Sequence, residues 1–227
     1  KTTMVDELLK QSGTFTEHQN IGERVMDSND IERERGITIL SKNTAIRYKD
    51  YKINILDTPG HQDFAEDTFR TLTAVDSVII VIDSAKGVET QTRKLMQVCR
   101  MRKTPVMVFI NKMDREGKDP FDLMDEVENE LGIHVRPLSW PINNGQRFKG
   151  VYNIFQSTLD LYTPNKTQVT ESIRFDDVSD PQIAELIGEN DALKLQEDLE
   201  MIEGVYNPFT HEEYLAGELA PVFFGSA

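Results

Sequence analysis

Three apolar segments of this chain each end on a polar residue, and this pattern constrains the fold more than any other feature of the sequence. The segments are "INILD", "SVIIVID" and "PVMVFIN", which end at Asp57, Asp83 and Asn111. The last two are continuously apolar, as strands are when helices cover both faces of a parallel sheet. The carboxyl ends of parallel strands form the edge at which open α/β folds bind ligands. We therefore expect these three polar residues to share one rim of a sheet.

Amphipathic segments alternate with these strands, as in proteins built from βαβ units. At the start of the chain, Met4, Val5, Leu8 and Leu9 recur at helical spacing on one face. Further along, Asp119 and Pro120 form the N-cap and first-turn pair that opens a helix. The pattern predicts helices over 2–11, 64–75, 90–102 and 120–131, and strands over 44–48, 52–57, 77–83 and 105–111. The expected fold class is α/β, with a doubly wound and mostly parallel sheet.

The pattern changes over residues 136–219, which we interpret as an α+β insertion before the last strand. "RPLSWPI" and "GVYNIFQSTLDLY" are typical of short strands, and acidic amphipathic helices follow, chiefly over 191–203. "PVFFGSA" then returns to a buried strand and a turn of small residues. The predicted organisation is therefore a ligand-binding domain over 1–135, an insertion over 136–219, and a last strand and loop over 220–227.

Charge and cysteine content exclude several classes of function. Twenty-five basic and 39 acidic side chains leave a net charge of −14. This charge argues against electrostatic binding of nucleic acid by the chain alone, and we expect no sequence-specific DNA binding. Residues 160–220 contain 15 acidic and three basic residues, so most of the excess lies there. Cys99 is the only cysteine, as suits a reducing cytosol. The longest apolar run, Val78–Ile82, is too short to span a membrane. We expect a cytoplasmic monomer.

The segment "DTPGH" has the residue types of a phosphate-sensing turn. Asp57 can hold a water bound to Mg²⁺, and Gly60, which lacks Cβ, lets its N–H approach a terminal phosphate closely. His61 would face the space where an attacking water lies. Each piece also has an ordinary interpretation, because such turns and single histidines are often only structural.

The segment "INKMD" favours a guanine site more sharply. Asn111 at a strand end can tie loops together, and Lys112 can lay its methylenes along a planar base. Asp114 can accept two hydrogen bonds, from the N1–H and N2 amine of guanine. Adenine has a lone pair at N1 and would leave the carboxylate unpaired. Sites of this sort discriminate by factors on the order of 10⁴.

Three shorter segments complete the set. Thr38, in "RGITI", can reach Mg²⁺ and the terminal phosphate when its loop is closed. The backbone N–H groups of Gly225, Ser226 and Ala227 can meet the O6 atom of guanine.

The opening residues Lys1, Thr2 and Thr3 match the close of the phosphate-loop motif GxxxxGK[ST], with the lysine on the β- and γ-phosphates and Thr2 on Mg²⁺. The expected ligands are GTP or GDP with Mg²⁺, and the expected fold is a P-loop NTPase domain that lacks its first strand. We expect that absence to leave a slot between 52–57 and 77–83. We also expect the fragment itself to be inactive and aggregation-prone, and to bind GTP weakly.

Taken together, these motifs resemble the translational GTPases, a family whose members have a histidine after the Asp-x-Pro-Gly turn, here His61. The resemblance implies ribosome-stimulated hydrolysis of GTP, with the histidine helping to orient the attacking water. From about residue 52 onward, "VIDSAKGVETQTRKLM", "NKMDREGKDPFDLMDEVENELGI" and "LAGELAPVFFGSA" resemble bacterial peptide chain release factor 3. That likeness implies a role in termination, with the ribosome and the stop-codon-reading release factors as partners.

Residues 1 to about 51, with "ERVMDSNDIERERGITILSKNTAI", instead resemble the BipA/TypA ribosome-associated GTPase, which is linked to ribosome assembly and stress. The change falls within "KINILDTPGHQDF", which both families share. Template switching between related DNA molecules would place a junction there, and a natural mosaic is the other interpretation. Because the release-factor likeness covers more of the chain, we favour it. The alternatives are a BipA/TypA-like GTPase, an ATP-using P-loop enzyme, which Asp114 argues against, and a non-catalytic module whose acidic insertion binds a basic partner.

Overall fold

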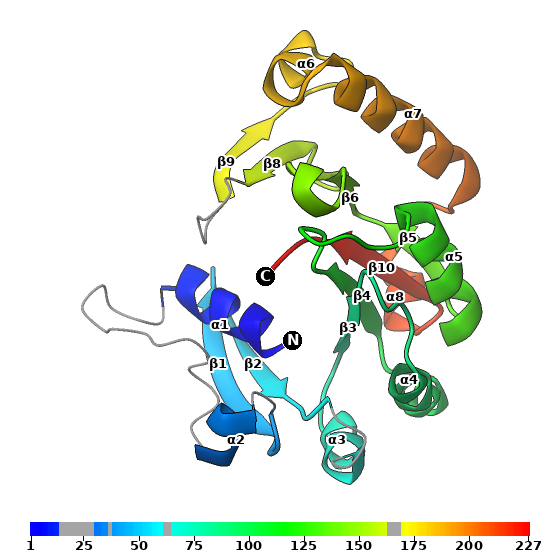
Figure 1. Cartoon of the computed structure of the whole chain (residues 1–227). Helices are drawn as coiled ribbons and strands as arrows, with labels where there is room; N and C mark the ends of the chain where they lie inside the picture. The colour runs from blue at the N-terminus through cyan, green and yellow to red at the C-terminus, as the bar shows by residue number, and fades with distance from the viewer. Residues whose placement is uncertain (14–29, 36–37, 61–64, 163–168) are drawn as a thin grey trace. The chain divides into compact units, whose positions relative to one another are not determined.

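A computed structural model describes residues 1–13, 30–35, 38–60, 65–162 and 169–227 of the chain (Figure 1). The chain divides into two compact units, one of residues 1–75 with Ala227 and one of residues 76–226.

The first unit is built on a β-hairpin. Strands β1 (Lys42–Tyr48) and β2 (Tyr51–Asp57) pair antiparallel, with Lys42 opposite Asp57. The helices of this unit are α1 (Thr2–Gln11), α2 (Asp30–Arg35) and α3 (Ala65–Leu72). The predicted apolar face of α1 is confirmed, because Val5 and Leu9 are buried in one cluster with Ile46 of β1, and Leu8 and Ile55 pack against that cluster.

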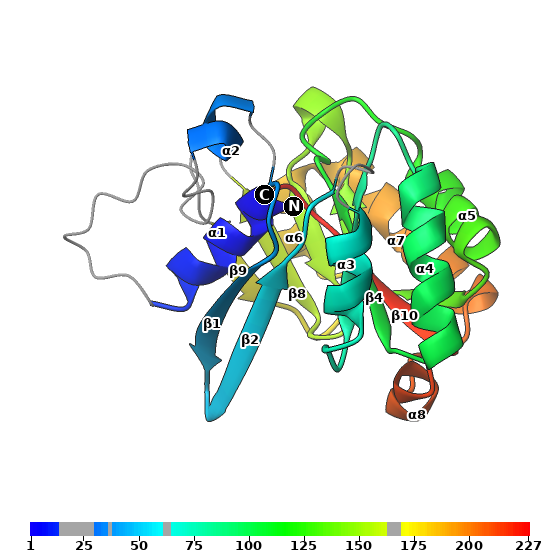
Figure 2. The same ribbon diagram turned by 90° about the horizontal axis from the view of Figure 1, so that it is seen from below.

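The second unit contains a four-stranded sheet in the order β3 (Val78–Asp83), β4 (Val106–Asn111), β10 (Leu219–Phe224), β5 (His134–Pro137). All three pairings are parallel. Helices α4 (Thr90–Arg102) and α5 (Pro120–Leu131) connect the strands and lie side by side (Figure 2). The α/β class predicted from the sequence is confirmed. The Asp119 side chain caps α5 by accepting a hydrogen bond from the Phe121 N–H.

Burial along the sheet follows strand position. On β4, Val106, Val108 and Ile110 are fully buried but Met107 and Phe109 are partly exposed, so the burial of both faces that its continuous apolar run predicts is only partly confirmed. Strand β3 differs, because Ile79 exposes 45% of its surface. Since β3 is an edge strand of this sheet, it has a neighbouring strand on one side only.

Residues 139–174 form a second sheet, antiparallel, in the order β6 (Ser139–Ile142), β7 (Gly150–Asn153), β8 (Thr158–Tyr162), β9 (Val169–Arg174). Helices α6 (Pro181–Ile187), α7 (Glu189–Val205) and α8 (His211–Leu215) follow. The short strands and acidic helices predicted for this stretch are confirmed, and so is the return to a buried strand at β10. The proposed domain boundaries at 136 and 219 stay a prediction.

Within the described residues, no helix is long and apolar enough to cross a membrane.

Candidate functional site

The first unit brings together four of the residues assigned to phosphate and Mg²⁺. The Thr2 hydroxyl, in the first turn of α1, donates to Asp57 Oδ2 at 2.9 Å and lies 2.8 Å from the Thr38 hydroxyl. Because Thr2 has one hydroxyl proton and gives it to Asp57, Thr38 is the donor between the two threonines. Lys1 Nζ lies 3.7 Å from Asp57 Oδ1 and donates to Thr58 Oγ1 at 3.4 Å.

Three oxygen-bearing side chains at this point fit a magnesium ion. Asp57 ends β2 and is 2% exposed, and its Oδ1 has no hydrogen-bond donor among the described residues. Asp57, Thr2 and Thr38 supply the hard oxygen ligands that Mg²⁺ prefers. The described residues contain no cluster of three or more His, Cys, Asp or Glu side chains suited to a metal.

Other residues assigned to the phosphate site are less defined. A Cβ at Gly60 would lie 3.8 Å from Lys1 Nζ, which is ordinary contact, so any need for glycine there would come from a bound phosphate. Thr3 is exposed in the first turn of α1. Their roles stay predictions. His61 lies outside the described residues.

Glu32 of α2 is a positioning residue that the sequence did not reveal. Its fully buried carboxylate accepts hydrogen bonds from the N–H groups of Ile39 (2.9 Å) and Leu40 (3.2 Å), and it also pairs with Lys42. Burial acts to raise the pKa of Glu32, but the bonds from Lys42, Ile39 and Leu40 together lower it to about 2. Glu32 therefore anchors the chain immediately after Thr38. The acidic residue in "ERERGITI" offered no periodic signal for this role.

We expect Glu32→Gln to release the segment that follows Thr38. The change should lower the opening free energy of the Ile39 and Leu40 amides by about 2–4 kcal/mol at pH 7, because a buried charged acceptor is lost. In the unchanged protein, the folded pKa of about 2 lies below the ordinary 4.5, so this contribution is present above pH 4.5 and declines as the pH falls toward 2. Hydrogen exchange of the two amides across that range measures both effects.

The matched control is Glu34→Gln, a change of the same kind on the exposed side of the same helix. It should leave exchange at Ile39 and Leu40 unchanged. Equal effects of the two variants would refute the anchoring role of Glu32.

The second unit brings together the residues assigned to the base. Asn111 ends β4 and is buried, and its Oδ1 accepts a hydrogen bond from the Lys112 N–H at 2.8 Å. Because β10 lies beside β4 in parallel register, the loops after the two strands meet. The Gly225 N–H donates to the Ile110 carbonyl at 3.0 Å, and the Met113 N–H donates to the Gly225 carbonyl at 3.1 Å.

Side chains complete this junction. The Ser226 hydroxyl donates to Asp114 Oδ1, and Asp114 is exposed. A Cβ at Gly225 would lie 2.9 Å from Phe109 Cζ, which explains why the turn has glycine. Asn111, Lys112, Asp114, Gly225 and Ser226 are therefore gathered as the motifs predict. Ala227 belongs to the first unit, so its contact with the base stays a prediction.

Asp83 and Ser84 hold Lys112 in place, a role that the motif analysis missed. Asp83 lies opposite Asn111 in the register of β3 and β4, as the shared rim predicts for this pair. Lys112 Nζ donates to Asp83 Oδ2 at 2.5 Å, and Ser84 Oγ donates to the Lys112 carbonyl at 3.0 Å. Burial acts to raise the pKa of Asp83, but hydrogen bonds from Lys112 and from the N–H groups of Ala85 and Lys86 lower it. The shared rim of Asp83 and Asn111 was predicted, but the pairing of Asp83 with Lys112 depends on strand register and has no local sequence signal.

Comparisons with known proteins identify the family and the fold of this chain. A family model described as "Elongation factor Tu GTP binding domain" matches residues 1–227. The crystal structure of a protein from Thermus thermophilus is similar over 99% of this chain, with a TM-score of 0.74 and 20% sequence identity. The chain covers 35% of that protein, so it spans about a third of its length. At that identity the likeness concerns the fold alone.

Proposed function

Because the chain belongs to the family of elongation factor Tu GTP-binding domains, we propose that it binds GTP and GDP with Mg²⁺ and hydrolyses GTP when the ribosome stimulates it. One observation carries this proposal. Asp114 is exposed, and among the described residues its only hydrogen-bond partner is Ser226. The other carboxylate oxygen is therefore open to the N1–H and N2 amine of guanine. Adenine presents a lone pair where guanine has N1–H.

The residues assigned to phosphate and Mg²⁺ support the proposed hydrolysis of GTP. Bound Mg²⁺ would neutralise charge that develops on the phosphate oxygens. Thr2, Thr38 and Asp57 would hold the ion, and Lys1 would pair with the β- and γ-phosphates. Gly60 would offer its N–H to the terminal phosphate. We assign His61 the orientation of the attacking water.

We further propose that the protein acts in the cytoplasm as a release-factor-3-like GTPase of translation termination, with the ribosome and the stop-codon-reading release factors as partners. The support is the likeness of residues from about 52 to 227 to that family. The alternative is a BipA/TypA-like role in ribosome assembly, which rests on the likeness of residues 1–51. Both place the protein on the ribosome.

Two measurements test the proposal. Labelled GTP bound to the protein should be displaced by unlabelled GTP or GDP, and a thousandfold excess of ATP should leave it bound. Displacement by ATP at equal concentration would remove the guanine assignment. In the second measurement, the protein with GTP should speed the departure of a stop-codon-reading factor from ribosomes that have released their peptide. Stimulated hydrolysis without faster departure would favour the BipA/TypA-like role.

A further inference from the structure

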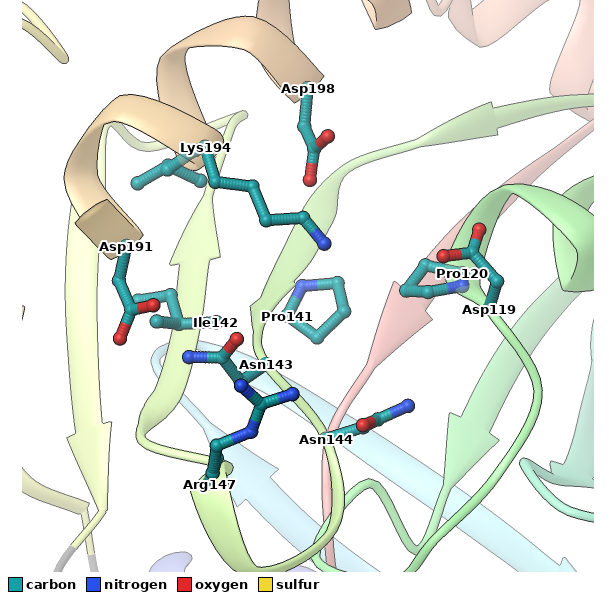
Figure 3. A pocket seen from close by; sticks show the side chains of 11 residues that line it. Asp119, Pro120, Pro141, Ile142, Asn143, Asn144, Arg147, Asp191, Lys194 and Asp198 are labelled. Carbon is teal, nitrogen blue, oxygen red and sulfur yellow. The ribbon is translucent and has the colours of Figure 1, made fainter.

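A small cavity in the second unit lies beside the base loops but outside the proposed nucleotide site (Figure 3). Its volume is about 200 Å³. Its walls come from the turn after β6, the start of α5 and one side of α7. A cavity of this size suits a molecule smaller than a nucleotide.

Acidic side chains surround the cavity, but each already accepts a hydrogen bond from the protein. Asp119 accepts from the Phe121 N–H at 2.9 Å, and Asp191 accepts from Lys149 Nζ at 2.6 Å. Asp198 accepts from Trp140 Nε1 at 2.9 Å. Lys149 therefore neutralises Asp191, whereas Asp119 and Asp198 are bonded to neutral donors and keep their charge.

Two cationic side chains of the cavity are not engaged in this way. Among the described residues, Lys194 and Arg147 form no ion pair or hydrogen bond, although they act electrostatically on Asp198 and Asp191, respectively. Figure 3 shows the ammonium of Lys194 and the guanidinium of Arg147 reaching the cavity from opposite sides of Pro141, with the Asn143 amide next to the guanidinium. The Asn143 amide is hydrogen-bonded to Asp191, so the donors open to a ligand are the two cationic groups, which favour an oxyanion whose oxygens accept charge-assisted hydrogen bonds.

The cavity is connected to the base loops by two sets of contacts. In the turn that carries Asn143 and Arg147, the Gly145 N–H donates to the Met113 carbonyl at 2.8 Å, within the base loop. On the other side, Asp198 holds Trp140, whose ring lies 5.2 Å from the ring of Phe224, the residue before Gly225.

We propose that this cavity binds a small oxyanion, a molecule with a free phosphate or carboxylate group, and that its occupancy tightens guanine-nucleotide binding. The oxyanion site is inferred from the cavity alone, and its coupling to nucleotide binding rests on the proposed function. An anion held by Arg147 and Lys194 would fix the turn against Met113 and so preorganise the base loop. The coupling is reciprocal, so nucleotide should tighten anion binding by the same factor.

The chain has one tryptophan, and Trp140 next to the cavity makes binding directly observable. At constant ionic strength, Trp140 fluorescence should change saturably with inorganic phosphate or with malonate, and the tighter probe identifies the preferred oxyanion. Lys194→Gln and Arg147→Gln should each raise the dissociation constant at least tenfold. The matched control Lys94→Gln, on an exposed position of α4, should change it less than twofold. A signal that does not saturate, or variants that bind like the control, would overturn the oxyanion site.

The coupling is tested with GDP. A saturating concentration of the better probe should lower the GDP dissociation constant at least threefold in the unchanged protein and have no such effect in Lys194→Gln. An unchanged or raised value in the unchanged protein would overturn the coupling. Failure of GDP to bind at all would overturn the proposed function and the coupling together, while the Trp140 titration would still decide the oxyanion site.

Discussion

In a version that carries the complete phosphate-loop motif, replacing Asp114 with asparagine should weaken GTP binding by about 3–5 kcal/mol, on the order of 10² to 10⁴ in the dissociation constant. The structure leaves the Asp114 carboxylate exposed, with Ser226 as its hydrogen-bond donor among the described residues. Guanine presents two donors to that position, and an amide would face them with an NH₂ group in place of one acceptor oxygen. Equilibrium titration with GTP, GDP and XTP measures the change. XTP should lose less binding affinity than GTP, or should bind more tightly, because its 2-oxo group prefers a hydrogen-bond donor.

The control for this variant is Asp122→Asn, which removes the same charge from an exposed position in the first turn of α5. It should leave the GTP dissociation constant within twofold. If Asp114→Asn also left GTP binding intact, the base would lie elsewhere and the guanine assignment would be wrong.

In the same version with the complete phosphate-loop motif, replacing His61 with alanine should reduce ribosome-stimulated hydrolysis by about two orders of magnitude or more, the usual scale for a positioned acid, base or water-orienting group. Affinity for GTP should stay within a few-fold, because the base and Mg²⁺ contacts that we propose do not involve the imidazole. Single-turnover hydrolysis with and without ribosomes separates the two effects.

A second histidine provides the comparison. His134→Ala removes an exposed imidazole that contacts Glu128. Its stimulated rate should match that of the unchanged protein. A His61→Ala protein with the same rate would show that the histidine after the turn is structural.

Elements with strong local signals were predicted closely. The helices 2–11, 90–102 and 120–131 have the predicted bounds. Amphipathic spacing marks helices 2–11 and 120–131, and the Asp119–Pro120 pair marks the start of helix 120–131. Helix α2 was not predicted. It has six residues, too few to be stable by propensity, and its Glu32 is held by partners from the following segment.

The grouping of the residues assigned to the base was largely predictable, since these residues follow strands that the apolar runs identify. What the sequence did not show was the support around them. The pairing of Lys112 with Asp83 and the contact of Gly145 with Met113 join residues 29 and 32 positions apart, and they depend on strand register and on a turn within the insertion. Such contacts arise from tertiary packing and leave no local pattern.

The close approach of Gly225 to Phe109 has a consequence for how this family can diverge. A Cβ at position 225 would meet the Phe109 ring at 2.9 and 3.2 Å, so a side chain there requires the ring to shift or a smaller residue to replace phenylalanine. The two positions should therefore change together over evolutionary time. Relatives with threonine or serine in place of this glycine should carry valine or another smaller residue two positions before the asparagine of the Asn-Lys-x-Asp loop. An aligned set of family sequences should show this covariation, because the ring of Phe109 packs against the α-carbon of Gly225.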